Sequence, residues 1–123
     1  MTSDSKNAVN WNDFGVYRNG EYGRDLPTNW LPVTSIDLGC GYEWEEFHAF
    51  WSPTARRYFW HGSAGCSCNS WADDVDAEAD FRNGGRADLL RAIREWCVKA
   101  ECSIDIYERA MSEVRAFREV SDD

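Results

Sequence analysis

The sequence predicts an α+β domain in which an antiparallel sheet of about four or five strands, built from two hairpins, is covered by a C-terminal antiparallel pair of helices. Two observations predict the sheet. Aromatic residues alternate with other residues on both sides of Pro53, and Asn19-Gly20 separates two further strand-like runs. A third observation predicts the helices, because from Asp88 onward apolar residues recur every three or four positions. Within the 123 residues we expect a disordered tail at 1–10 and one domain at 11–120.

The first hairpin is expected around Asn19-Gly20, between the runs 14–18 and 21–25. Both central residues of a type I′ turn need positive φ angles, which Asn and Gly adopt more readily than other residues. A connection that contains two prolines follows, and a further strand is expected at 33–38.

The central hairpin is expected within residues 42–71, which contain four of the seven tryptophans and both histidines. Pro53 has the φ angle needed at the second position of a type I turn. Pairing Ser52 with Arg57 leaves a loop of about four residues, a common hairpin length. One face then carries the pairs Trp51–Tyr58, Ala49–Trp60 and Phe47–Gly62, and the other carries Phe50–Phe59 and His48–His61.

The alternation is irregular at the start of this hairpin. The apolar phase falls on Tyr42 and Trp44 and shifts by one residue at Glu45-Glu46. This pattern predicts either a bulge at Glu45-Glu46 or a strand that begins after Tyr42.

Two helices are expected after Gly84-Gly85. The first starts near Asp88, and the second covers residues 104–119 with Ser103 as its N-cap. Each has one apolar stripe that must be covered, so we expect the pair to lie on one face of the sheet. Between sheet and helices, residues 72–83 are predicted to contain a short helical turn.

The net charge of −9 limits the choice of partners. Phosphate backbones and anionic membranes repel such a chain, so we expect no direct nucleic-acid binding and no membrane binding. No apolar run is long enough to span a membrane, and the first residues lack the features of a signal peptide, so we expect a cytoplasmic protein. In that compartment, five cysteines indicate free thiols or metal ligands rather than a disulfide framework.

Two chemical sites are candidates within the central stretch. His48, His61, Cys66 and Cys68 are ligand types that zinc takes, and Cys40 could replace one of them. The alternative is that the thiols pack as small apolar groups. Cys66 or Cys68 with His61 also supplies the residue types of a thiol enzyme, although no nucleophile signature surrounds the cysteines.

The densest charge in the chain is a group of five acids. A solvated acidic loop is one interpretation, while a calcium loop is disfavoured because Ala79 and Gly85 occupy positions that require other residues. The other interpretation is a docking surface for a basic protein, joined by Glu43, Glu45, Glu46 and residues 119–123 in mimicry of a nucleic acid. The residues predicted to bind the partner are Trp71, Asp73, Asp74, Asp76, Glu78 and Asp80.

Exposed tryptophans would strengthen the docking interpretation, since tryptophan is enriched at interfaces. Trp11, Trp30 and Trp71 lie in predicted loops, where burial is not guaranteed. Trp44, Trp51, Trp60 and Trp96 are instead expected in the core.

An aromatic block followed by Gly-Cys-Ser-Cys resembles a family of short proteins of unknown function from actinobacteria and their bacteriophages. The matching residues are Tyr58, Trp60, Ser63, Gly65, Cys66, Ser67, Cys68 and Trp71. This resemblance implies a phage or prophage accessory protein and brings no established activity.

We therefore expect a small non-catalytic phage or prophage protein that binds a basic host or defence protein. One alternative is a zinc-binding or thiol-dependent enzyme centred on His61, Cys66 and Cys68. Another is a virion accessory component, which predicts an oligomer formed through an apolar patch.

Overall fold

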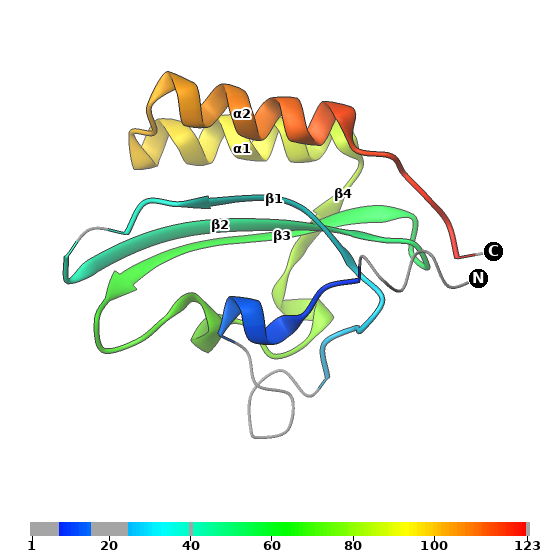
Figure 1. Cartoon of the computed structure of the whole chain (residues 1–123), viewed down its shortest axis with the longest axis horizontal. Helices are drawn as coiled ribbons and strands as arrows, with labels where there is room; N and C mark the ends of the chain where they lie inside the picture. Colours follow the sequence, from blue (N-terminus) through cyan, green and yellow to red (C-terminus); the bar gives the residue numbers. More distant parts are fainter. Residues whose placement is uncertain (1–7, 16–24, 40, 123) are drawn as a thin grey trace.

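The structure, a computed structural model, describes residues 8–15, 25–39 and 41–122 (Figure 1). The strands are β1 (Leu31–Asp37), β2 (Glu43–Ser52), β3 (Arg57–Cys66) and β4 (Arg82–Gly84), and the α-helices are α1 (Arg86–Ala100) and α2 (Ile104–Ala116). Three short 3-10 helices are η2 (Trp11–Phe14), η3 (Trp71–Asp74) and η4 (Glu78–Asp80).

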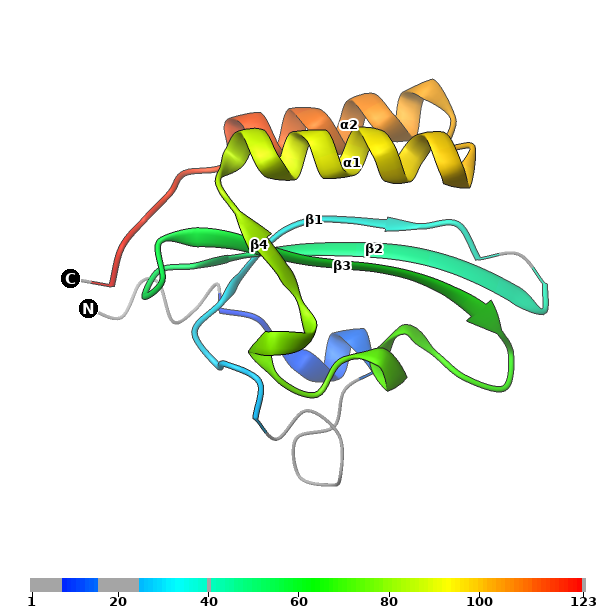
Figure 2. The same ribbon diagram turned by 180° about the vertical axis from the view of Figure 1, so that it is seen from behind.

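The four strands form one antiparallel sheet in the order β1-β2-β3-β4. Figures 1 and 2 show α1 and α2 side by side on one face of this sheet, while η2, η3 and η4 lie on the opposite face. We call this second side the loop face. The arrangement confirms the predicted α+β fold with a C-terminal helix pair. The strand β4 was not predicted.

The central hairpin has the predicted register. Ser52 pairs with Arg57 and His48 with His61, and the pairing continues without a shift to Glu43 and Cys66. The strand therefore begins after Tyr42, as one of the two alternatives predicted, and there is no bulge at Glu45-Glu46 in this ladder. The register shift of the sheet is instead in β1, between Pro32 and Thr34, where the prolyl residue has no N–H to donate.

The two faces of the hairpin belong to two separate cores. On the helix face, Phe47, Trp51 and Trp60 pack with Leu89 and Ile93 of α1 in a core that also takes residues from α2. Burying an aliphatic side chain of this size contributes about 1.5–3 kcal/mol. At Gly62 a Cβ atom would lie 2.7 Å from the Trp96 ring, so the absence of a side chain lets α1 approach β3 closely.

The loop face has an aromatic core of its own. Trp30 stacks on Phe59 with 4.6 Å between ring centroids, and the Trp11 indole donates to the Pro27 carbonyl at 2.7 Å. The burial of Trp11 and Trp30 was not settled by the sequence; both are buried because they cover the sheet, so neither strengthens the docking interpretation. This core also contains Val9, Leu26, Phe50, Trp71, Ala72, Val75 and Phe81.

Two predictions near the N-terminus fall mostly outside the described residues. These are the tail at 1–10 and the hairpin around Asn19-Gly20. Where the chain is described, Val9 is buried and its N–H donates to the Trp30 carbonyl at 2.7 Å, so it is not part of a free tail. Phe14 ends the helix η2 and does not begin a strand.

The second helix starts as predicted and ends earlier. The Ser103 hydroxyl accepts a hydrogen bond from the Ile106 N–H at 3.3 Å, which is the expected N-cap. The helix ends at Ala116 rather than at 119, because the chain then turns toward the β2–β3 hairpin. There the Arg86 guanidinium donates to the Phe117 carbonyl and the Trp51 indole to the Val120 carbonyl, both at 2.6 Å.

No helix in the described part of the chain is both long enough and apolar enough to cross a bilayer.

Candidate functional site

An imidazole pair lies on the loop face of the sheet. The register places His48 of β2 opposite His61 of β3, and alternation directs both side chains away from α1 and α2. The Trp71 ring contacts both imidazoles edge-on, with centroid distances of 4.6 Å to His48 and 6.0 Å to His61. The Trp71 indole N–H also donates to the His61 carbonyl at 3.1 Å, which holds η3 against this part of the sheet.

His48 is the buried member of the pair, with 6% of its surface exposed. Its Nε2 is 2.7 Å from Glu46 Oε1 and its Nδ1 is 2.7 Å from Ser35 Oγ. A carboxylate only accepts hydrogen bonds, so Nε2 carries the proton of the neutral ring and Nδ1 accepts from the Ser35 hydroxyl. Burial lowers the pKa of His48, and this effect outweighs the opposite effect of the Glu46 and Asp37 carboxylates.

His61 has a different environment. Its Nε2 is buried and makes no hydrogen bond in the described structure, and the nearest carboxylate oxygen, Oδ2 of Asp74, is 3.7 Å away. On the same strand, the Ser63 hydroxyl is also buried without a hydrogen-bond partner among the described residues. Buried polar atoms are nearly always paired, and an ordered water is the usual partner where no protein group is within reach.

The predicted acidic residues lie in residues 71–80, a segment that covers the loop face. We call this segment the acidic cover. Two of its acids fix the backbone: Asp73 accepts from the Ser70 N–H at 2.9 Å, and Asp80 accepts from the Asp76 and Ala77 N–H groups at 2.7 and 3.0 Å. All five carboxylate residues are exposed. Within the described residues, Asp73, Asp74, Glu78 and Asp80 form no ion pair with lysine or arginine.

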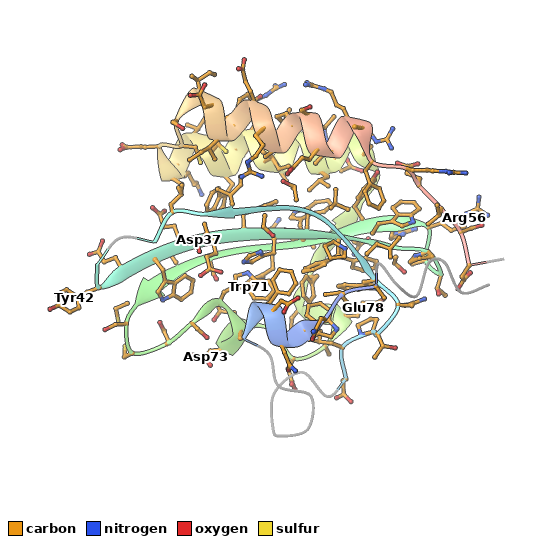
Figure 3. The ribbon with its side chains drawn as sticks, viewed as in Figure 1. Asp37, Tyr42, Arg56, Trp71, Asp73 and Glu78 are labelled. Carbon is orange, nitrogen blue, oxygen red and sulfur yellow. The ribbon has the colours of Figure 1, made fainter. Side chains whose placement is uncertain are left out.

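Trp71 is not available to a partner, contrary to the prediction. Its exposed fraction is 1%, because the ring fills the space between the acidic cover and the imidazole pair. Figure 3 shows Trp71 close to the sheet and Asp73 farther from it. Trp71 therefore positions the acids and does not itself present a surface.

The negative charge of the molecule is concentrated in two segments. Residues 37–46 hold four acids and the acidic cover holds five, and neither contains lysine or arginine. These nine charges equal the net charge of −9 of the whole chain. In Figure 3, Asp37, Tyr42 and Asp73 lie toward the end of the sheet opposite Arg56, which is in the β2–β3 turn.

Glu119 and Asp122 do not join this acidic group, contrary to the prediction. The Glu119 carboxylate accepts from the Tyr58 hydroxyl at 2.8 Å and pairs with Arg86 at 3.1 Å. Asp122 accepts from the Thr54 hydroxyl beside the β2–β3 turn. Burial and the hydrogen bond to Glu119 raise the pKa of Tyr58 to about 12. These two acids hold the C-terminal segment against the hairpin.

The predicted zinc ligands are not brought together. His61 and Cys66 are five residues apart on an extended strand, roughly 16 Å at 3.3 Å per residue, and their side chains point to opposite faces. Both nitrogens of His48 are already hydrogen-bonded. No group of three or more His, Cys, Asp or Glu side chains in the described ranges is placed to hold a metal ion, and Cys40 lies outside those ranges. Zinc binding stays a prediction.

The same separation affects the predicted thiol enzyme, because His61 is too far from Cys66 along β3 to act as its base. Cys66 and Cys68 are both exposed and follow the end of β3. They contact each other through a side-chain hydrogen bond, which makes them a pair of thiols separate from the imidazoles.

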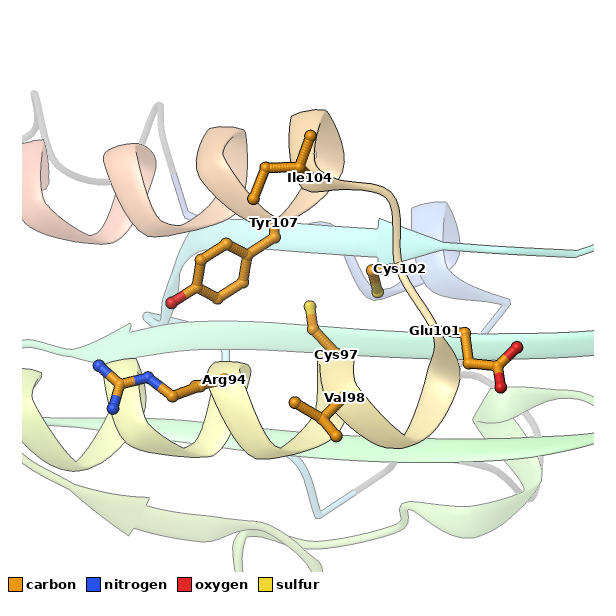
Figure 4. A pocket seen from close by; sticks show the side chains of 7 residues that line it. All are labelled: Arg94, Cys97, Val98, Glu101, Cys102, Ile104 and Tyr107. Carbon is orange, nitrogen blue, oxygen red and sulfur yellow. The ribbon is translucent and has the colours of Figure 1, made fainter.

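A groove that was not predicted lies between the end of α1 and the start of α2 (Figure 4). Its volume is about 380 Å³, and it is lined by Arg94, Cys97, Val98, Glu101, Cys102, Ile104 and Tyr107. Val98 and Ile104 are 74% and 64% exposed, which is unusual for side chains of this type. The groove offers the apolar surface that an oligomer contact would need, and the predicted oligomer stays a prediction.

The cysteines of this groove have a structural role. Glu101 has a left-handed φ of 57°, its N–H donates to the Val98 carbonyl, and the Cys102 N–H donates to the Cys97 carbonyl at 3.0 Å. These two bonds define a Schellman motif, in which the side chains at the positions of Cys97 and Cys102 normally touch. Burial raises the pKa of Cys97 to about 12, so this thiol stays protonated.

The residues around the imidazole pair could be found in the sequence only in part. Glu46 shares a strand face with His48, two residues away, and strand alternation alone reveals this. Ser35 reaches His48 only because of the register shift in β1, and Asp74 reaches His61 only because η3 folds under the sheet. Neither placement has a signal in the local sequence.

The chain belongs to the family described as a domain of unknown function, DUF7574, which it matches over residues 27–122. No curated protein matches the chain, and no solved structure does.

Proposed function

We propose that this chain is a non-catalytic binding domain whose acidic cover, together with the carboxylates around the imidazole pair, contacts a basic protein. The observation that carries the proposal is the exposure of the acidic cover: Asp74 and Glu78 project from a segment whose buried face is fixed by Trp71 and Phe81. A surface that is negative and held rigidly favours a positive partner by electrostatic complementarity.

Direct contact with nucleic acid is disfavoured because the same carboxylates would repel phosphates.

The biological setting of the proposal rests on the resemblance of the Gly-Cys-Ser-Cys block. On that resemblance the protein is a phage or prophage accessory protein, and its partner is a basic host or defence protein in the cytoplasm of the host.

A pair of charge-matched variants tests the acidic cover. Asp74→Asn with Glu78→Gln removes two carboxylates from the cover without touching Asp73 or Asp80, which hold its backbone. Glu95→Gln with Glu108→Gln removes two exposed carboxylates from the helices and gives the same net charge. Immobilised wild-type protein should retain a defined set of basic proteins from host lysate at low salt and release them at about 0.5 M salt.

The two variants should differ in binding, because the position of the removed carboxylates matters and not the net charge of the protein. Binding of the retained proteins should fall roughly three- to tenfold for the cover variant and stay near wild type for the helix variant. Equal losses of binding for both variants would show that only the net charge matters. Retention that persists at high salt would contradict an electrostatic contact. Either result overturns the proposal.

A further inference from the structure

A pair of thiols lies at the end of β3, just before the acidic cover in the sequence. Cys66 is the last residue of the strand, Cys68 follows after one residue, and both are exposed. Cys66 and Cys68 lie in one tight turn, closed by the Asn69 N–H donating to the Cys66 carbonyl, and the Cys68 thiol is near enough to act as a hydrogen-bond donor to Cys66. Two accessible thiols at this separation can react with the same molecule in sequence.

The backbone around the pair is fastened by Trp44. Its indole N–H is shared between the carbonyls of Cys66 and Asn69, at 2.9 and 3.0 Å. The Asn69 N–H closes the turn by donating to the Cys66 carbonyl at 3.1 Å. A Cβ at Gly65 would lie 2.7 Å from the Trp44 ring and 2.5 Å from the Asn69 side chain, so glycine is needed for this arrangement. The loop therefore holds its thiols in a defined position.

The two thiols are not equivalent. Hydrogen bonds from the Cys68 thiol, from the Cys68 N–H and from its own N–H lower the pKa of Cys66, while the same contact raises the pKa of Cys68. A thiolate is the nucleophile in disulfide exchange, and a protonated neighbour can follow as the second thiol. Cys97 and Cys102 do not offer this combination, since Cys97 is buried.

We propose that Cys66 and Cys68 form a dithiol site for exchange with disulfides of low molecular weight, with Cys66 as the attacking and Cys68 as the resolving thiol. The proposal does not depend on a basic partner, although Asp73 of the acidic cover lies close enough to help raise the pKa of Cys68.

The exchange balances in two steps. The Cys66 thiolate attacks one sulfur of the disulfide, forms a mixed disulfide, and releases the other half as a thiolate that takes up a proton. The Cys68 thiol loses its proton to solvent and attacks the Cys66 sulfur, which releases the second half and closes a Cys66–Cys68 disulfide. The small disulfide is reduced to two thiols and the protein pair is oxidised. The ring closed across one intervening residue is strained, so excess reduced thiol should reopen it.

Glutathione disulfide is the probe for the test. The full-length reduced protein is mixed with it at neutral pH, quenched with N-ethylmaleimide and measured by mass spectrometry. Wild type should lose the two alkylation sites of this loop without retaining glutathione. Cys68→Ser should accumulate glutathione on Cys66, because the resolving thiol is absent. Cys66→Ser should react at least about fivefold more slowly than wild type.

Cys102→Ser is the matched control, since it removes one thiol from the other pair and should leave the reaction of this loop unchanged. The rate of adduct formation on Cys68→Ser, followed against pH, adds a reading that a purely structural role would not produce. A Cys66→Ser protein that reacts as fast as wild type would overturn the role of Cys66. Equal accumulation of glutathione on wild type and on Cys68→Ser would overturn the role of Cys68.

Discussion

At the scale of single residues, His48 shows how a polar group is kept in an aromatic layer. Its two ring nitrogens are satisfied by Ser35 and Glu46, and Phe14 and Trp71 lie against its ring. A buried imidazole whose hydrogen bonds are complete costs little, whereas a protonated one at the same place must give up the bond from Ser35 or reorient it.

This environment predicts a dependence of stability on pH. The pKa of His48 in the folded protein is lower than its ordinary value of 6.5, so the unfolded chain binds the proton more tightly. The contribution of His48 is fully present above pH 6.5 and is lost as the pH falls through the lower value of the folded state. The charged and titratable groups that face the ring are Glu46, Asp37 and His61.

The variant His48→Gln keeps a donor for Glu46 and removes the titration. Urea unfolding of wild type and variant between about pH 7 and pH 5 should give a shallower fall of the unfolding free energy for the variant. Parallel curves for the two proteins would show that the imidazole does not titrate differently on folding.

At the scale of secondary-structure elements, the start of α2 depends on one side chain. Ser103 caps the helix through the Ile106 N–H, and the preceding residues are fixed by the Schellman motif that ends α1. Replacing Ser103 with alanine should lower the unfolding free energy by about 0.5–2 kcal/mol. Ser112→Ala is the control, because it changes an exposed serine inside the same helix and should be neutral or slightly stabilising, as measured by urea unfolding.

Elements whose pattern is repeated along the chain could be predicted, and short or non-local ones could not. The β2–β3 register follows from aromatic residues on both sides of Pro53, and the helices follow from their apolar spacing. The strand β4 has three residues without an apolar pattern and exists because it pairs with Tyr58–Trp60 of β3.

The same division applies to the candidate site. The opposition of His48 and His61 is a property of one hairpin and was predicted correctly. The burial of Trp71 depends on how the acidic cover packs beneath the sheet, which no local pattern records. Tertiary contacts between distant segments therefore decide what a partner can reach.

At the scale of the whole molecule, repulsion among the carboxylates opposes folding. Nine excess negative charges in one domain repel one another, and added salt screens this repulsion. The melting temperature should rise between low salt and about 0.5 M sodium chloride, measured by circular dichroism. The variant with Asp74→Asn and Glu78→Gln should gain less from salt than wild type. A melting temperature that falls with salt would contradict this expectation.

The shortness of β4 has a consequence for how copies of the protein behave toward one another. Pairing on that side of β3 ends at Trp60, so in the described part of the chain the edge from His61 to Cys66 has no neighbouring strand. The Trp71 indole occupies the His61 carbonyl, and the residues beyond it, 62–65, have no bulky side chain. Open edges of this kind invite another chain to add itself to the sheet. Mutual repulsion between copies opposes that addition, so acidification that neutralises the carboxylates should make concentrated protein aggregate.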